Sequence, residues 1–308
     1  MPIGVLTVQS FLANAYNRFH VSILQTIASY TSIALQNVNA FTQLDDAKKT
    51  IESKSRNILD SIRYAERIQN AVLPNVGSVT KHFAENFILY KPKDIVSGDF
   101  YWFRGTDKYA IVIVADCTGH GVPGAFMSMI GSILFDELIN RKRLLDPAKI
   151  LHELHIAVRN SLQQQTTSNT DGMDVCLCYV TKGEKANTKD ITFAGAKRPL
   201  YVVKSGEFEQ VGGDRKSIGG RQREAERIFT NKTLTLSKGD MIYLTSDGYA
   251  DQNDEGNNKY GNKKFKETLA QIANLSTEEQ NTFLSNELKT FQGSKSQRDD
   301  ITVIGFKM

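Results

Sequence analysis

The sequence predicts an α+β sandwich, because strand-like segments dominate it and the helices are grouped between them. From about residue 83 onward, short apolar runs bounded by turns follow one another. These runs are FILYKP, FYWF, YAIVIVA, MDVCLCYV, ITFAG, LYVVKSG, KTLTLSKGD, MIYLTSDG and DITVIGF. Three helical stretches interrupt them: residues 125–141, a stretch from residue 146 through ILHELHIAVRNSL, and KKFKETLAQIA with EEQNTFLSNELKTF. No glycine-rich dinucleotide fingerprint follows the first strand and no P-loop is present, so a βαβ nucleotide-binding fold is not expected.

Composition places the chain among ordinary globular proteins. Its 308 residues allow one large domain with a smaller one, and 40% are hydrophobic and 23% charged. The net charge of +4 is spread along the chain without a concentrated basic tract, so nothing calls for nucleic-acid binding. No apolar run approaches the roughly 18 residues that cross a bilayer, and MPIGVLTVQS does not resemble a secretory signal. We therefore expect a cytoplasmic protein with no membrane segment in this chain.

The cysteines suggest neither a disulfide framework nor a zinc site. There are three of them, Cys117, Cys176 and Cys178, and an odd number does not pair completely. Cys176 and Cys178 share one face of the run DVCLCYV, where small buried side chains are expected. No further soft ligands stand at a suitable spacing for zinc.

Residues 1–37 contain one expected strand, GVLTV at residues 4–8, a turn-like segment, and a helix from Val21. One strand and one helix cannot bury a core alone. The segments GVLTVQS, AY and ILQTIASYTSIALQN resemble the C-terminal end of a GAF domain. This resemblance implies that residues 1–37 are the remnant of a sensor domain.

Residues 38–75 are predicted to be a helical linker, because no Gly or Pro occurs in them before Pro74. A heptad spacing relates Leu44, Ile51, Ile58, Ala65 and Val72, with Phe41 and Ile62 offset from it and polar residues at Lys48, Ser55 and Gln69. The helix could pack on its own domain, or it could be a parallel coiled coil that pairs two chains. We favour the second interpretation and expect a homodimer, in which weak polar steps would suit a signalling linker.

Four acidic motifs stand at the ends of strand-like runs. They are Ser97-Gly98-Asp99, Ala115-Asp116-Cys117, Ser246-Asp247-Gly248 and Arg298-Asp299-Asp300. One carboxylate in such a place is usually a turn former or a helix cap. Four carboxylates gathered together would repel one another unless cations neutralised them, and two divalent ions would balance their charge. Because oxygen ligands select hard cations, the sequence predicts two Mn²⁺ or Mg²⁺ ions.

Such a pair of ions suggests hydrolysis of a phosphoester. Two ions about 4 Å apart can share a water molecule, lower its pKa and hold it in line with a phosphoryl group. That chemistry needs no side-chain nucleophile, and we find no convincing Ser-His-Asp or cysteine arrangement in the sequence.

The order of motifs over residues 76–308 then carries a specific resemblance. The motifs SGDFYW, ADCTGHGVPGAFMSM, DGMDVCLCYV, AGAKRPLYVV, GGDRKSIGG, LTSDGYAD and QRDDITVIGF are similar to those of the metal-dependent type 2C (PPM) Ser/Thr protein phosphatases, in the bacterial SpoIIE-like branch. The resemblance implies an αββα four-layer sandwich with a two-metal site between its sheets.

The resemblance also assigns site residues. Asp99 corresponds to the first metal ligand, and Asp116 to the aspartate that bridges both ions and so takes part in catalysis. Cys117 would supply its backbone carbonyl, and Asp247 and Asp299 match the remaining ligands. Asp300 stands where the wider family often has Asn, so we expect it outside the ligand set, although the choice between Asp299 and Asp300 stays open.

Two departures from the wider family concern the leaving group and the phosphate. The family often has a histidine two residues after the bridging aspartate; here Thr118 stands there, and His120 follows in a GHG turn. His120 is a candidate catalytic acid, but a turn histidine bonded to backbone is slightly favoured. The phosphate-binding arginine of the family has no clear counterpart. Lys91, Lys93 and Arg198 are candidates by their place in the sequence, but solvation at the surface is the default expectation for each.

The resemblance implies a phosphatase that acts on phosphoserine or phosphothreonine of a small regulator similar to anti-sigma-factor antagonists (STAS proteins). The missing sensor would set its activity through the linker. One alternative is a catalytically silent dimeric scaffold, against which the intact acidic set argues. Another is a metal-dependent nuclease or other phosphoesterase, against which the motif order and the lack of an aromatic-interleaved basic stripe argue. The pair His152 and His155 could bind a metal, but we interpret it as a packed helix face.

Overall fold

The computed structural model of the chain describes residues 3–73 and 79–308. It divides into two compact units, Met1–Ser61 and Ile62–Met308.

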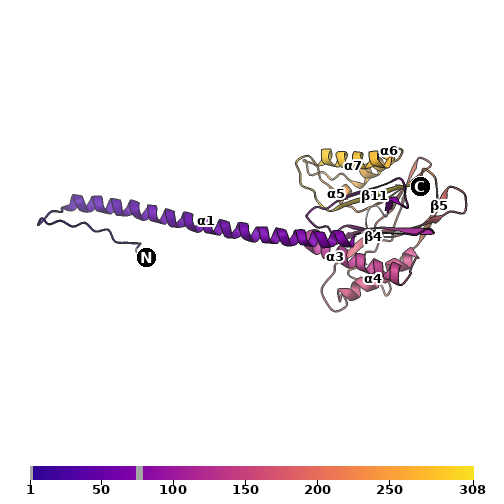
Figure 1. Ribbon diagram of the computed structural model, residues 1–308, viewed down its shortest axis with the longest axis horizontal. Coiled ribbons are helices and arrows are strands. Elements are labelled where there is room, and N and C mark those ends of the chain that lie inside the picture. Colours follow the sequence, from indigo (N-terminus) through magenta and orange to yellow (C-terminus); the bar gives the residue numbers. More distant parts are fainter. Residues whose placement is uncertain (1–2, 74–78) are drawn as a thin grey trace. The chain divides into compact units, whose positions relative to one another are not determined.

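The first unit consists mainly of the helix α1 (Arg18–Val72), which continues into the second unit (Figure 1). The helix begins three residues before the expected start at Val21, because the Asn17 side chain accepts hydrogen bonds from the backbone N–H groups of Phe19 (3.0 Å) and His20 (3.2 Å). The expected end at Pro74 lies outside the described residues.

The strand expected at residues 4–8 is not formed. That segment forms no regular element, and residues 3–6 line a cavity with residues 28–36 of α1. A strand needs a neighbouring strand to bond its backbone, and the described part of the first unit contains no other. The GAF assignment of residues 1–37 therefore stays a prediction.

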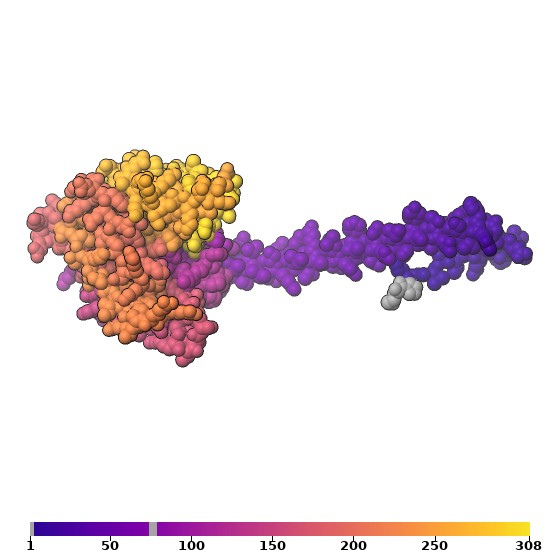
Figure 2. Space-filling model, turned by 180° about the vertical axis from the view of Figure 1, so that it is seen from behind, coloured from indigo at the N-terminus to yellow at the C-terminus, as the bar shows by residue number. Residues whose placement is uncertain are grey.

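The heptad side chains of α1 are largely uncovered. Phe41, Leu44, Ile51 and Ile58 are 73%, 67%, 66% and 60% exposed, and the helix surface is bare over much of the view in Figure 2. Gln69 is the buried residue among those described in this helix. The homodimer that these side chains suggest stays a prediction.

The second unit is built on two antiparallel sheets. One sheet has the order β1-β11-β10-β6-β7, and the other has the order β2-β3-β4-β5-β9 with β8 paired to β4. Their bounds are β1 Asn86–Lys91, β2 Phe100–Gly105, β3 Tyr109–Cys117, β4 Gly172–Lys182, β5 Thr188–Ala196, β6 Leu200–Lys204, β7 Glu207–Val211, β8 Ile218–Gly219, β9 Lys232–Ser237, β10 Met241–Thr245 and β11 Ile301–Lys307. Each strand expected in this unit forms. The sequence did not predict β7 and β8, because one is mostly exposed and the other has only two residues.

Both faces of each sheet are covered, which gives the expected four layers (Figure 1). Strand β3 illustrates the alternation: Ile111 and Ile113 pack toward the helices on their sheet, whereas Val112 and Val114 pack in the core between the sheets. That central core also takes Ile242 from the other sheet. The α+β four-layer sandwich predicted from the sequence is confirmed.

The helices fall into two groups. On the β2–β3 sheet lie α3 (Gly121–Phe135), the π-helical turn η1 (Asp136–Arg141) and α4 (Pro147–Ser161). On the other sheet lie α5 (Gly248–Asp251), α6 (Asn262–Ile272) and α7 (Thr277–Gln292). The third helical stretch of the sequence thus forms two helices, and Ser276 starts the second with a capping box to Glu279.

One helical stretch in the described residues, Gly121–Arg141, has the length and composition of a membrane span, with a mean hydropathy of 1.4. No such stretch was expected from the sequence. This stretch is 56% buried within the fold, as expected for a core helix that packs on a sheet.

Candidate metal centre

The four predicted acidic ligands come from adjacent strand ends in both sheets. Asp99 directly precedes β2 and Asp116 lies near the end of β3, and the pairing of Phe100 with Ala115 brings these two ends together. Asp247 follows β10 and Asp299 precedes β11, and these strands also pair with each other. The centre therefore receives two carboxylates from each sheet.

Asp99 is the most buried of the four. Asp99 is only 3% exposed, and its Oδ2 accepts a hydrogen bond from the Thr302 hydroxyl at 2.9 Å. Burial raises the pKa of Asp99 well above its ordinary value, and repulsion from Asp116 raises it further. The fold therefore holds a carboxyl group here in a place that disfavours its charge.

The remaining three carboxylates repel one another. Burial raises the pKa of Asp116 well above its ordinary value, and Asp247 adds the next largest contribution. The pKa of Asp299 is raised by burial and also by Asp247. A divalent cation would relieve this repulsion and keep the carboxylates ionised.

The donor chemistry fits a hard cation, because these candidate ligands offer carboxylate oxygens. Within residues 3–73 and 79–308, however, no three His, Cys, Asp or Glu side chains are grouped closely enough to hold one ion as they stand. Binding would have to draw the carboxylates together.

Arg198 supplies positive charge to the centre. Its Nη2 lies 3.0 Å from Oδ2 of Asp247 and its Nη1 lies 3.7 Å from Oδ2 of Asp116. The side chain is only 16% exposed, so the expectation that it is solvated is wrong. It reaches the centre because the short connection between β5 and β6 turns at Lys197, which has φ of +58°.

Sequence reasoning missed Asp174. This residue pairs directly with Asp116 across β3 and β4. Its carboxylate accepts a hydrogen bond from the Ser217 hydroxyl at 2.6 Å and lies 3.7 Å from Arg198. Asp174 does not stand at a strand end but inside the run MDVCLCYV, so the strand-end pattern does not include it. The register of β3 with β4 identifies it instead.

Asp300 has a different environment from Asp299. Both of its oxygens are occupied by backbone: Oδ1 accepts from Lys93 N (2.8 Å) and Oδ2 accepts from Gly98 N (2.7 Å). The Asp299 carboxylate accepts one bond, from Asp300 N at 2.9 Å. Asp300 thus fixes the position of the loop between β1 and β2, which carries Asp99.

Cys117 is buried beside Asp116 at the end of β3. Burial, followed by the charge of Asp116, raises the pKa of its thiol well above the ordinary value. The thiol is therefore kept protonated and is no nucleophile. The prediction that its backbone carbonyl binds metal stays a prediction.

His120 bonds to side chains rather than to backbone, so the favoured interpretation of it was wrong. Its Nδ1 lies 2.9 Å from Oδ2 of Asp94, and its Nε2 lies 2.8 Å from Nζ of Lys93. The lysine ammonium can only donate, so Nε2 accepts and Nδ1–H donates. The charge of Lys93 partly opposes the rise in the pKa of Asp299 that burial causes, so this trio borders the acidic centre.

The linker helix also reaches the centre, through the side chain of Gln69. Its Nε2 donates to the carbonyl of Ser97 (2.7 Å) and to the hydroxyl of Ser128 (2.8 Å). Its Oε1 accepts from Ser97 N at 3.1 Å. Gln69, which interrupts the heptad pattern, therefore contacts the loop that carries Asp99.

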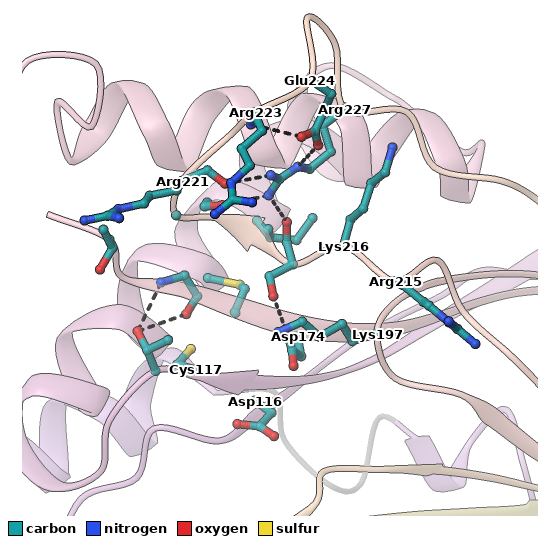
Figure 3. Close-up of a pocket in the computed structure, with 18 of the residues that line it drawn as sticks. Asp116, Cys117, Asp174, Lys197, Arg215, Lys216, Arg221, Arg223, Glu224 and Arg227 are labelled. Atoms are coloured by element: carbon teal, nitrogen blue, oxygen red, sulfur yellow. Dashed lines mark hydrogen bonds and ion pairs between the residues drawn. The ribbon is translucent and has the colours of Figure 1, made fainter.

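A cavity of about 500 Å³ opens beside the acidic centre (Figure 3). It is lined by Asp116, Asp174 and Asp247 and by basic residues of the loop between β7 and β9. A phosphorylated group could reach the carboxylates from this side.

The chain is similar to a known protein family and to several solved structures. The family model described as "Stage II sporulation protein E (SpoIIE)" matches residues 106–308. The chain belongs to the SpoIIE family of PP2C-type phosphatases. The match begins after Asp99 and includes the three other predicted carboxylate ligands.

Solved structures agree with this assignment. The SiaA-PP2C domain of Pseudomonas aeruginosa is 35% identical, with a TM-score of 0.72 over 82% of this chain and 98% of that domain. Lower identities accompany a shared fold in two further structures. The PP2C phosphatase domain of SpoIIE from Bacillus subtilis with a regulatory fragment is 16% identical (TM-score 0.55, 72% and 63% covered), and the S. agalactiae serine/threonine phosphatase is 15% identical (TM-score 0.51, 73% and 99% covered). A comparison with curated protein sequences finds no significant match.

Proposed function

We propose that this SpoIIE-family chain is a metal-dependent phosphatase that hydrolyses phosphoserine or phosphothreonine on a regulatory protein. The observation that carries the proposal is the convergence of two carboxylates from each sheet, where burial and repulsion raise the pKa values of Asp99, Asp116 and Asp299. Such an arrangement calls for bound cations.

Asp99, Asp116, Asp247 and Asp299, with the backbone carbonyl of Cys117, would hold two Mn²⁺ or Mg²⁺ ions. When bound, the ions would supply a water molecule of lowered pKa and would neutralise charge on the phosphoryl group. We assign Asp299 rather than Asp300 as the ligand, because both oxygens of Asp300 already accept backbone N–H bonds.

The residues around the ions would position the phosphate. The Arg198 guanidinium lies within the acidic centre and has fork geometry suited to phosphate oxygens. Its Nε is buried without a hydrogen-bond partner in the described residues, so a donor remains free for a ligand. His120, held between Asp94 and Lys93, is suited to give a proton to the leaving oxygen.

Regulation would act through α1. Gln69 bonds both backbone groups of Ser97, two residues before Asp99. A shift or rotation of the helix would therefore move the loop that presents the first ligand. A parallel homodimer through the exposed heptad side chains would let a sensor impose that shift. The expected substrate is a phosphorylated STAS-like regulator.

The test is hydrolysis of a phosphopeptide and of a generic phosphoester with Mn²⁺, with Mg²⁺ and with chelator. Asp247→Asn should abolish metal-dependent turnover, whereas Asp107→Asn, an exposed turn residue, should leave it unchanged. Loss of activity in both variants, or activity that persists in chelator, would contradict the proposal. A folded, metal-binding protein with no turnover would instead favour the silent scaffold.

A further inference from the structure

The wall of the cavity opposite the acidic centre is strongly basic. It is formed by residues 212–231, the connection between β7 and β9. Between residues 215 and 227 this connection, called the basic loop below, carries five basic side chains against two acidic ones. The cavity thus joins a carboxylate floor to a cationic wall.

The basic loop has a defined shape because Arg227 holds it from within. This arginine is only 7% exposed, and it donates to the backbone carbonyls of Ser217 (2.7 Å), Gly219 (3.0 Å) and Arg221 (2.8 Å). It also pairs with Glu224 at 2.6 Å. One buried guanidinium therefore bonds several points along the loop.

The helix α4 supports the same loop from below. Nδ1 of His155 accepts from Gly219 N at 3.0 Å, and its Nε2 donates to Oε1 of Gln222 at 2.9 Å. His155 is 2% exposed. The interpretation of His155 as a packed helix residue is correct, and its packing fixes the loop.

The other cations of the basic loop are not used in holding it. In the described chain, no hydrogen bond or ion pair is formed by the side chains of Arg215, Lys216, Arg221 and Arg223. Solvation is the ordinary state of such charges. Four of them around one cavity nevertheless create a positive potential that attracts anions.

Their directions indicate what kind of anion would fit. Figure 3 shows Arg215 and Arg221 pointing to opposite sides of the cavity, with Arg223 between them. A single phosphate would need these groups to converge on one point. Spread side chains suit several carboxylates carried along an extended segment instead.

We propose that the basic loop binds an acidic segment of the protein substrate, adjacent to the phosphorylated residue. This inference rests on the proposed phosphatase function and specifies its substrate as a phosphoprotein with Asp or Glu near the phosphoserine or phosphothreonine. Exposed charges at such a rim act mainly on association and selectivity, and salt screens them.

Binding can be measured without catalysis. Fluorescent peptides that are not phosphorylated, one acidic and one neutral, would be titrated in chelator by anisotropy. Wild type should prefer the acidic peptide, and Arg221→Gln/Arg223→Gln should weaken its binding about three- to tenfold. The preference should vanish near 0.5 M salt. The matched control, Lys263→Gln/Lys289→Gln on α6 and α7, removes two exposed cations elsewhere and should change nothing.

Equal binding of both peptides by wild type would overturn the proposal, as would equal weakening by the control variant. Kinetics separate this inference from the proposed function. With metal, wild type should show a lower KM for an acid-flanked phosphopeptide than for a neutral one, and the double variant should lose that difference. If wild type hydrolyses no phosphoester at all, the proposed function fails, whereas the peptide titration still decides whether the basic loop binds acidic segments.

Discussion

Gln69 offers the sharpest test of how the linker helix connects to the candidate metal centre. Its side chain makes three hydrogen bonds, two to the backbone of Ser97 and one to the hydroxyl of Ser128. Gln69 is 3% exposed and Ser97 is fully buried. Replacing Gln69 by Leu would keep most of its volume and remove all three bonds.

The expected loss follows from these bonds. Each buried hydrogen bond contributes about 1 kcal/mol, and a buried group left unpaired costs about 1–3 kcal/mol. Ser128 keeps other partners, the carbonyls of Ala125 and Ser97. The Ser97 carbonyl can still accept from the Ser128 hydroxyl, so the unpaired Ser97 N–H carries most of the loss. We expect Gln69→Leu to lower the free energy of unfolding by about 2–4 kcal/mol.

Urea unfolding of the second unit would measure this loss, and isothermal titration with Mn²⁺ would measure its effect on the centre. Metal affinity should fall because the loop that carries Asp99 is released. Gln43→Leu, at an exposed position of the same helix, should change either quantity by less than about 0.5 kcal/mol. A loss below about 1 kcal/mol for Gln69→Leu, or unchanged metal affinity, would refute the reasoning.

Three further predictions concern the same unit. Burial lowers the pKa of His155. Its contribution to stability is therefore full above its unfolded pKa of about 6.5 and is lost as the pH falls through its lower folded pKa. Between about pH 7.5 and 5.5, the free energy of unfolding should fall less for His155→Gln than for wild type. In chemical denaturation, Gly124→Ala should lower the free energy of unfolding by about 3 kcal/mol or more. The added Cβ would overlap the carbonyl oxygen of Gly119 and approach Cα of Gly98 to 2.8 Å. The control Gly212→Ala should be tolerated, because a Cβ there meets nothing within 4 Å. Arg198→Met should lower the melting temperature measured in chelator, because Asp116 and Asp247 lose their buried counter-ion. Arg198→Lys keeps a positive charge and should restore part of the loss. Equal melting temperatures for wild type and both variants would contradict this account.

Features with a short-range cause could be predicted from the sequence. Apolar runs such as YAIVIVA identified the strands, since period-two patterning needs no knowledge of the partner strand. The same runs revealed the acidic residues at their ends, and the structure brings the carboxylates of both sheets to one region. The prediction of a strand at residues 4–8 was wrong: the local pattern is strand-like, but the described part of this unit contains no other strand to pair with it.

The missed residues depend on contacts between distant segments. Asp174 joins the centre through its register with Asp116, and Arg198 enters it through a turn conformation at Lys197. In the sequence, Gln69 is only a polar residue that interrupts a heptad pattern, because its hydrogen-bond partner Ser97 lies 28 residues away. Polar residues of this kind carry no periodic signal, so only the assembled fold assigns them.

The charge arrangement explains why the centre can be stable before any ion binds. Taking several carboxylates out of water is costly unless positive charge compensates for them. Arg198 provides that compensation for Asp116 and Asp247, while backbone N–H groups satisfy Asp300. Because Asp99 and Asp116 come from one sheet and Asp247 and Asp299 from the other, cations bound by all four would join the two sheets directly. Binding energy would then add to folding stability by mass action, about 2.7 kcal/mol at a hundredfold excess over the dissociation constant. The same coupling works in reverse: a movement of α1 that displaces Ser97 through Gln69 would shift Asp99 relative to the other sheet and so weaken the hold on the cations.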